Sequence, residues 1–260
     1  MTGWQDYLDV IPHRHHTVVG TLKVLFDVWS PQLNNHRDIL VYLPPAYDAT
    51  VKPYPVIYMH DGQNLFDSAT GFAGQEWQVD ETMESLSREG LEAIVVGIPH
   101  MGANRLQEYN PFPEFRGGQG ELYLDFITDT LKSIIDRDFR TLPDRDHTGL
   151  IGSSMGGLIS LYGFFHRPHT FGFTGVMSPA LWIAGGAIYE DVQAQSFVPG
   201  KIYLDNGTRE SSARKMNAIL AEKGYALNRD LKYVIEHEAE HHEPAWARRL
   251  PDALRFLLPR

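Results

Sequence analysis

The chain has 260 residues, of which 43% are hydrophobic and 22% charged. This composition can build a large core and excludes the disordered and collagen-like classes. The formal net charge is −10, from 33 acidic and 23 basic residues, so the overall field would repel a phosphate backbone and we expect no nucleic-acid partner. Cysteine is absent, which excludes disulfides, thiolate nucleophiles and iron–sulfur clusters.

The sequence also bears on location and assembly. It contains no apolar run of about 18 residues that could span a bilayer, and its start lacks the basic and apolar regions of a signal peptide. We therefore expect no membrane contact and a cytoplasmic protein. Without repeats or long flexible linkers, residues 1–260 are expected to form a single domain. A homodimer is the expected assembly, because symmetric dimers are the commonest oligomers.

Apolar runs rich in β-branched residues predict eight strands. These strands occupy residues 17–28, 38–43, 56–60, 93–98, 148–151, 173–177, 201–204 and 231–235. The first two have no helix between them, and the second ends at Leu43 before two prolines, which a central strand would not tolerate. We therefore expect antiparallel strands at one edge of the sheet.

Helical spacing of apolar residues predicts five helices. They occupy residues 76–88, 122–135, 158–165, 213–221 and 244–258. Because the later strands alternate with helices, the chain is expected to be an α/β protein with a mostly parallel central sheet and helices on both faces. Residues 101–120 and 184–200 are expected to be long loops near the carboxyl ends of strands, where α/β folds bind ligands.

A candidate nucleophile lies in the sequence GSSMG at residues 152–156, which fits G-x-S-x-G. The motif follows a short apolar run and precedes a predicted helix, which is the strand, sharp turn and helix that a nucleophilic serine requires. Gly152 and Gly156 leave room for the tight turn, and the helix directs its N–H groups towards the same place. Ser154 is therefore the predicted nucleophile.

A serine needs a base and an acid that orients the base, which in this motif class follow in the order Ser, Asp or Glu, His. Asp205 ends a predicted strand, whereas Glu210 lies in the loop beyond it, from which it can extend towards a histidine. We prefer Glu210 and keep Asp205 as the alternative. After the last predicted strand, His241 is the preferred base and His242 its alternative, while His237 lies at the strand end itself.

Two N–H donors are needed to stabilise an oxyanion. The residue after the nucleophile, Met155, is expected to supply one, and Gln63, in the turn after the strand at 56–60, the other. No cofactor is expected. We also expect no metal site, since His13, His15 and His16 are near neighbours in sequence at one end of the chain and such residues rarely converge into a cage.

Several segments together resemble the putative esterase family of the α/β-hydrolase fold, which includes esterase D, enterochelin esterases and carbohydrate esterase family one. The matching segments are YLPPAYD at 42–48, HDGQNLFD at 60–67, EYNP at 108–111, GSSMGG at 152–157, SPALW at 178–182, YLDNGTRE at 203–210 and EHHEPAW at 240–246. The resemblance covers nearly the whole chain.

This resemblance implies a cofactor-free serine esterase that acts on a small-molecule ester through an acyl-enzyme, with Ser154, Glu210 and His241 as the triad. An acyltransferase and a thioesterase of the S-formylglutathione hydrolase type are the alternatives. Arg105 matches an arginine of the family and is expected to contact substrate. Tyr109 and Trp182 are expected either to line the substrate pocket or to pack the long loops.

Overall fold

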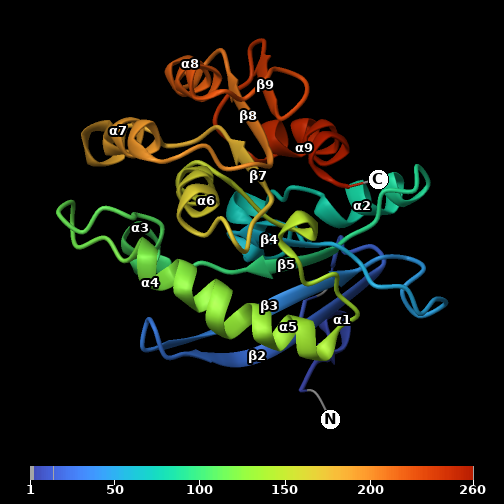
Figure 1. Ribbon diagram of the computed structural model, residues 1–260. Coiled ribbons are helices and arrows are strands. Elements are labelled where there is room, and N and C mark those ends of the chain that lie inside the picture. Colours follow the sequence, from blue (N-terminus) through green and yellow to red (C-terminus); the bar gives the residue numbers. More distant parts are fainter. Residues whose placement is uncertain (1–2, 14, 260) are drawn as a thin grey trace.

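A computed structural model describes residues 3–13 and 15–259, so residues 1, 2, 14 and 260 of the expected domain lie outside its described part. Its strands pair in one nine-stranded sheet in the order β1-β2-β3-β5-β4-β6-β7-β8-β9 (Figure 1). The strands are β1 (Gln5–Asp6), β2 (Thr21–Ser30), β3 (Asn35–Leu43), β4 (Val56–His60), β5 (Ile94–Ile98), β6 (Thr148–Ser153), β7 (Phe173–Met177), β8 (Lys201–Gly207) and β9 (Leu231–Glu236).

The sheet has a parallel part and an antiparallel edge, as predicted. Neighbouring strands from β5 to β9 are parallel, whereas β1, β2 and β3 are antiparallel to one another and β3 is antiparallel to β5. All eight predicted strands are present. Because β3 ends at Leu43, Pro44 and Pro45 lie beyond its hydrogen-bonded ladder, which explains how β3 can lie inside the sheet between β2 and β5.

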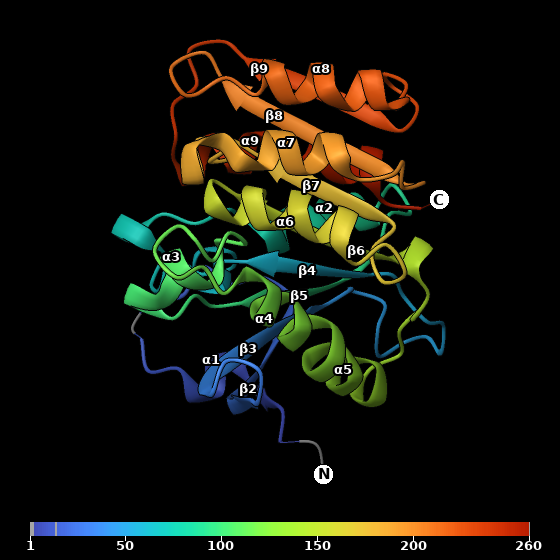
Figure 2. The ribbon, with the colours of Figure 1, turned by 60° about the vertical axis from the view of Figure 1, so that its left-hand side comes forward.

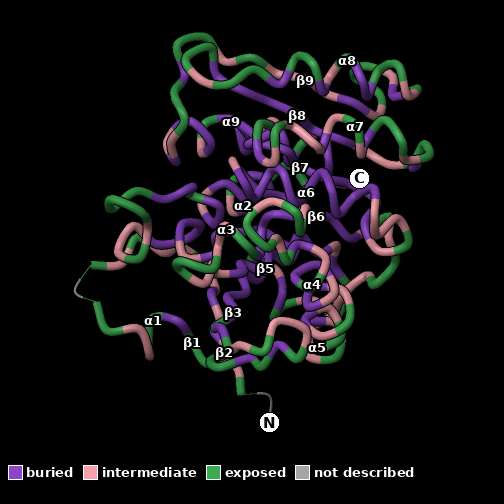
Figure 3. The backbone as a smooth tube through the Cα atoms, turned by 90° about the vertical axis from the view of Figure 1, so that its left-hand side faces the viewer, coloured by how far each residue is buried: buried purple, intermediate pink, exposed green. Residues whose placement is uncertain are grey.

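Helices cover both faces of the sheet, which confirms the predicted arrangement (Figure 2). The apolar sides of α2 and α9 pack with one cluster of core side chains, and those of α4 to α8 pack with the cluster on the other face. The helices are α1 (Tyr7–Val10), α2 (Val79–Ser87), α3 (Arg105–Glu108), α4 (Gly120–Asp125), α5 (Lys132–Asp138), α6 (Met155–His166), α7 (Ala187–Ala194), α8 (Arg214–Lys223) and α9 (Glu243–Leu257). Strands in the middle of the sheet are buried along their length (Figure 3).

Several helical regions differ from the prediction. The short helices α1 and α3 were not predicted, and α3 lies in the segment 101–120 that was expected to be a loop. The helix expected at 122–135 consists of α4, a π-helical segment at Phe126–Leu131 and α5, which follow one another without a break. The segment 184–200, expected to be a loop, contains α7. Only Ile188 and Val192 of this eight-residue helix are buried, which is too short an apolar pattern to distinguish from a loop.

The candidate site residues meet at one edge of the sheet. Ser154 directly follows β6, Glu210 lies beyond β8 and His241 beyond β9, while Asp61 directly follows β4. Because these strands are parallel neighbours, the loops after them share the edge formed by the carboxyl ends.

Candidate active site

Ser154 occupies a strained turn between β6 and α6. Its φ of 55° and ψ of −118° are rare for a residue with a side chain, and its N–H donates to the carbonyl of Met177 at 3.0 Å. A Cβ on Gly152 would lie 2.7 Å from the carbonyl carbon of Gly156, and a Cβ on Gly156 would lie 3.2 Å from the Cβ of His60. The chain therefore packs so closely around Ser154 that only glycine fits at 152 and any side chain at 156 would be crowded.

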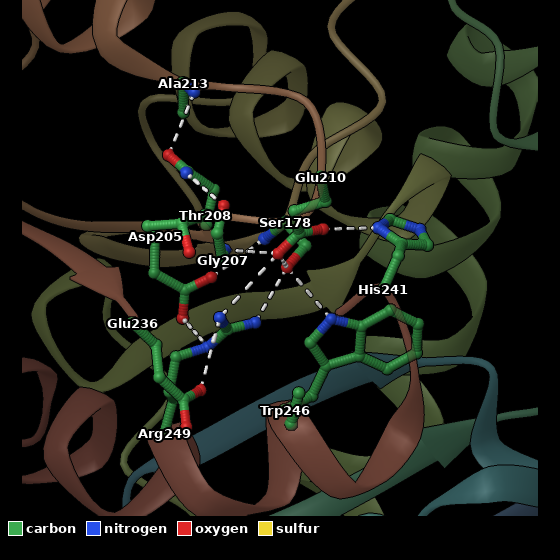
Figure 4. Close-up of polar contacts among 12 residues, drawn as sticks. Ser178, Asp205, Gly207, Thr208, Glu210, Ala213, Glu236, His241, Trp246 and Arg249 are labelled. Carbon is green, nitrogen blue, oxygen red and sulfur yellow. Dashed lines mark hydrogen bonds and ion pairs between the residues drawn. The ribbon is translucent and has the colours of Figure 1, made fainter. Parts of the chain in front are cut away.

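His241 contacts Glu210 and not the alternative acid, Asp205. The distance from His241 Nδ1 to Glu210 Oε2 is 2.6 Å, with the Glu210 side chain 4% exposed and the imidazole 42% exposed (Figure 4). Burial alone would raise the pKa of Glu210, but hydrogen bonds from His241, Gly207 and Ser178 outweigh it and lower the pKa. Glu210 is therefore a carboxylate that accepts from the imidazole.

Asp205 has different partners. It is fully buried, accepts from the N–H of Ser178 at 2.9 Å and lies 3.1 Å from Nε of Arg249 (Figure 4). Burial raises the pKa of Asp205 to about 7 despite the opposing effect of Arg249. Asp205, at the end of β8, therefore contacts the loop after β7 through Ser178 and contacts α9 through Arg249.

The other two candidate histidines have separate positions. His242 precedes α9, and its Nδ1 accepts from the N–H of Ala245 at 3.3 Å as a helix N-cap. His237 is exposed directly after β9. Of the three, His241 is the one whose imidazole contacts a buried carboxylate.

Ser154 and His241 line the same cleft, whose volume is about 540 Å³. Its walls also include polar side chains from the loop after β4, among them Gln63 and Asn64, and from the start of α9, namely His242 and Glu243. Trp246 completes the side near His241, with its ring centroid 5.1 Å from that of the imidazole. The candidate nucleophile and base therefore lie in the walls of one solvent-accessible cavity.

The two expected oxyanion donors come from the start of α6 and from the turn after β4. Met155 is the first residue of α6, where the N–H groups have no partner within the helix. Gln63 lines the cleft in a turn that begins at Asp61, which has a positive φ of 57°. A Cβ on Gly62 would lie 2.6 Å from the carbonyl carbon of Gly97 in β5, so the turn packs directly against the sheet.

The three expected substrate-contact residues have different environments. Arg105 lines the cleft but makes two 2.7 Å hydrogen bonds to Asp61. Tyr109 is fully buried beneath it and accepts from the N–H of Asp61 at 3.0 Å, so it supports the loop and does not line the cleft. Trp182 is 64% exposed and is also absent from the cleft wall. Of these three residues, Arg105 alone faces the cavity.

His60 is a buried residue beneath the candidate nucleophile. Its Nδ1 lies 2.8 Å from the hydroxyl of Tyr123, and burial lowers its pKa to about 3. The imidazole is therefore neutral at ordinary pH. Because its ring packs against the Cβ positions of Gly152 and Gly156, His60 supports the turn without facing the cleft.

The comparison with protein families decides which family the chain belongs to. A family model described as "Putative esterase" matches residues 30–257. The chain belongs to this family. It is therefore a carboxylic ester hydrolase.

Two relatives of this esterase differ in how much of the two chains the similarity covers. Uncharacterized protein YbbA of Bacillus subtilis (strain 168) is 27% identical over 245 residues, which cover 85% of this chain and 92% of YbbA. Siderophore triacetylfusarinine C esterase of Aspergillus fumigatus is 28% identical over 151 residues, which cover 55% of this chain and 49% of that protein.

The crystal structure of ferric enterobactin esterase from Salmonella typhimurium matches with a TM-score of 0.73 at 20% identity, covering 92% of this chain and 58% of that chain. The shared architecture confirms the predicted α/β-hydrolase fold. Within the described residues of the esterase, no helix has the length and apolar character needed to cross a membrane.

Three acidic side chains gather away from the cleft. Glu76, Asp80 and Glu81 place potential ligand atoms within 4.8 Å of one another, and the first two residues are buried. His16, one of the three histidines near the start of the chain, is not part of this acidic group, because its Nδ1 lies 2.6 Å from Oδ2 of Asp67. Burial raises the pKa of Glu76 to about 7 and that of Asp80 to about 9, so both carboxyls keep a proton to a higher pH in the fold than in the unfolded chain.

These raised pKa values predict a stability change in Asp80→Asn. Folded Asp80 retains a proton that the unfolded chain loses above about pH 4, so wild-type stability falls as pH rises towards the folded pKa. Asparagine removes this loss and still accepts from Val19. We expect the variant to be more stable by about 1 kcal/mol or more at pH 8, with a smaller gain near pH 4, in urea denaturation. The exposed Asp48→Asn is the control, and an equal gain at both pH values would contradict this explanation.

Proposed function

We propose that the chain is a serine esterase that cleaves a small-molecule ester through an acyl-enzyme on Ser154. The observation that carries the proposal is the 2.6 Å contact between His241 and the buried side chain of Glu210. The imidazole of His241 also lines the same cleft as Ser154, whose backbone is strained. A base oriented by a carboxylate in the same cleft as a serine is the arrangement that activates a hydroxyl for acyl transfer.

The proposed reaction has two halves. Ser154 Oγ attacks the acyl carbon while His241 Nε2 accepts the hydroxyl proton, and Glu210 stabilises the imidazolium through Nδ1–H. The N–H groups of Met155 and Gln63 stabilise the tetrahedral oxyanion. Collapse breaks the ester C–O bond, and the alcohol leaves with the proton from His241. A water molecule then repeats the attack on the acyl-enzyme, which releases the carboxylic acid and restores Ser154.

The cleft, whose walls combine polar side chains with Phe72 and Trp246, supports a small ester as substrate. Arg105 and Asp61 neutralise each other in its wall, and the pKa of Glu243 is raised because burial disfavours its charged form. Relatives named as siderophore esterases also support a small-molecule ester. Because Arg105 is engaged with Asp61, the proposed substrate need not carry a negative charge.

Covalent labelling with a fluorophosphonate tests this proposal directly. We expect one adduct on Ser154, located by peptide mass spectrometry, and labelling that slows by at least about 100-fold in His241→Ala because general-base assistance is lost. His242→Ala is the matched control, since it removes the neighbouring imidazole of the cleft wall and the cap of α9 but leaves the pair of His241 and Glu210, and it should retain rapid labelling. Label on another residue, or equal rates in the two histidine variants, would contradict the assignment.

A further inference from the structure

Ser178 lies at the centre of a buried polar network behind Glu210 (Figure 4). It follows β7, is 2% exposed and has a positive φ of 42°. Its N–H donates to both the side chain and the carbonyl of Asp205, at 2.9 and 3.1 Å. The backbone of Ser178 is therefore held in an unusual conformation that directs its hydroxyl towards the β8 loop.

Three side chains surround the Ser178 hydroxyl. Nε1 of Trp246 lies 3.0 Å from Oγ and Nη2 of Arg249 lies 2.7 Å from it, while Oε1 of Glu210 lies at 2.7 Å. An indole and a guanidinium can only donate, so they use the two acceptor positions of the hydroxyl. The single Ser178 proton is thereby directed to Glu210.

The same hydrogen-bond directions determine which nitrogen of the His241 imidazole carries the proton. Glu210 Oε1 accepts from Ser178 Oγ–H and from the N–H of Gly207, which leaves Oε2 to face His241 Nδ1 at 2.6 Å. A carboxylate offers no proton, so Nδ1 of His241 must be the donor. In the neutral imidazole the lone pair is then on Nε2, the atom that a general base requires.

We propose that Ser178 is a positioning residue of this esterase, whose hydroxyl is polarised by Trp246 and Arg249 and fixes Glu210 so that His241 keeps its proton on Nδ1. The inference rests on the proposed function, because it assigns a role that is exercised only through Glu210 and His241. It adds to the triad a fourth side chain, contributed by the loop after β7.

The other contacts of Glu210 explain why the Ser178 hydroxyl matters. Without it, Glu210 Oε1 keeps the N–H of Gly207 and a guanidinium nitrogen of Arg249 at 3.7 Å, which is an ion-pair distance and not a directed hydrogen bond. The N–H groups of Trp246 and Arg249 would also lose their shared acceptor. The carboxylate could then rotate, and the orientation of His241 would be less well defined.

A double-mutant cycle tests the proposal. Ser178→Ala is made in the wild type and in Glu210→Ala, and kcat and KM are measured with p-nitrophenyl acetate. In the wild type we expect kcat to fall roughly 10- to 100-fold with little change in KM, as for the loss of a hydrogen bond to a charged group. In the Glu210→Ala background we expect Ser178→Ala to cost less than about 2-fold, because the group through which it acts is gone.

Ser160→Ala is the matched control, since Ser160 is a fully buried serine of α6 whose Oγ has no hydrogen-bond partner among the described residues. It should leave kcat unchanged. An equal loss from Ser178→Ala in both backgrounds would show a merely structural effect and overturn the proposal, as would wild-type kcat in Ser178→Ala. If Glu210→Ala itself retained full activity, the proposed triad would fail instead, so the two failures are distinguishable.

Should Ser178→Ala not fold, Trp246→Phe replaces it in the same cycle. Phenylalanine keeps an aromatic ring near His241, removes one donor to Ser178 Oγ and makes the ring in the cleft wall smaller. A loss of about 3- to 10-fold in kcat that disappears in the Glu210→Ala background would support the proposal. A loss that persists there would overturn it.

Discussion

Ser154→Ala is expected to lower kcat/KM for p-nitrophenyl acetate by about 10⁴-fold or more. The hydroxyl is the group that forms the acyl-enzyme in the proposed reaction, and no other residue can replace the bond it makes. The side chain contributes little to packing, because it lies in the cleft wall and its backbone alone bonds to Met177. The free energy of unfolding should therefore stay close to that of the wild type.

The strain at Ser154 offers a control for this prediction. A φ of 55° with a ψ of −118° is readily adopted only by glycine, so Ser154→Gly should be at least as stable as Ser154→Ala in urea denaturation while equally inactive. Activity above about 1% of wild type in either folded variant would contradict the assignment of Ser154 as nucleophile.

Arg249→Met is expected to cause the largest loss of stability, about 3 to 5 kcal/mol, or a fall in Tm of roughly 10 °C. The guanidinium is 4% exposed and lies within 4 Å of three carboxylates, those of Asp205, Glu210 and Glu236. Methionine preserves much of the side-chain volume but leaves these carboxylates without their buried cation. Differential scanning calorimetry and urea denaturation both measure the effect.

The pH dependence separates this mechanism from simple loss of packing. Burial raises the pKa of Asp205, and Arg249 opposes that shift, so removing Arg249 should raise the pKa further. The folded variant then retains protons that the unfolded chain has released, and its stability falls as pH rises. We expect Arg249→Met to be more damaging at pH 8 than at pH 5.

Arg248→Met, one position earlier in α9, is the matched control for Arg249→Met. Its side chain is 54% exposed and pairs with Glu236, so we expect a change of less than about 1 kcal/mol at either pH. Equal losses in the two variants would show that burial of the Arg249 charge is not the cause. A loss in Arg249→Met that did not vary with pH would contradict the proposed role of the carboxylates.

The sequence predicted the parts of the site that depend on local constraints. The turn at Ser154 was predictable because Gly152 and Gly156 satisfy a steric requirement within five residues of chain, and the flanking strand and helix follow directly. The strands β2 to β9 were predictable because each contains a short apolar run, whereas β1 consists of Gln5 and Asp6 and was not predicted. The burial of Tyr109 and the exposure of Trp182 were not predictable, because both residues lie in segments without periodicity and an aromatic side chain can pack in a core or line a cleft.

The network around Ser178 could not be predicted in the same way, because it joins the loops after β7 and β8 to α9 through contacts between distant residues. One signal was nevertheless present. Arg249 lies between Trp246 and Leu250 on the apolar side of α9, where a charged residue is out of place unless it is paired. A charged residue at such a helical position can indicate a buried network before its partners are known.

The order of the site residues along the chain has a consequence for protein synthesis. Ser154 precedes the strands β7, β8 and β9, whereas His241 and Arg249 come from the final strand-to-helix segment of the described chain. A nascent polypeptide emerges from the ribosome with its amino-terminal part first. A chain whose α9 is still inside the exit tunnel would carry the proposed nucleophile without its base. In the proposed mechanism, hydrolysis should therefore begin only after α9 has left the tunnel and folded onto the sheet.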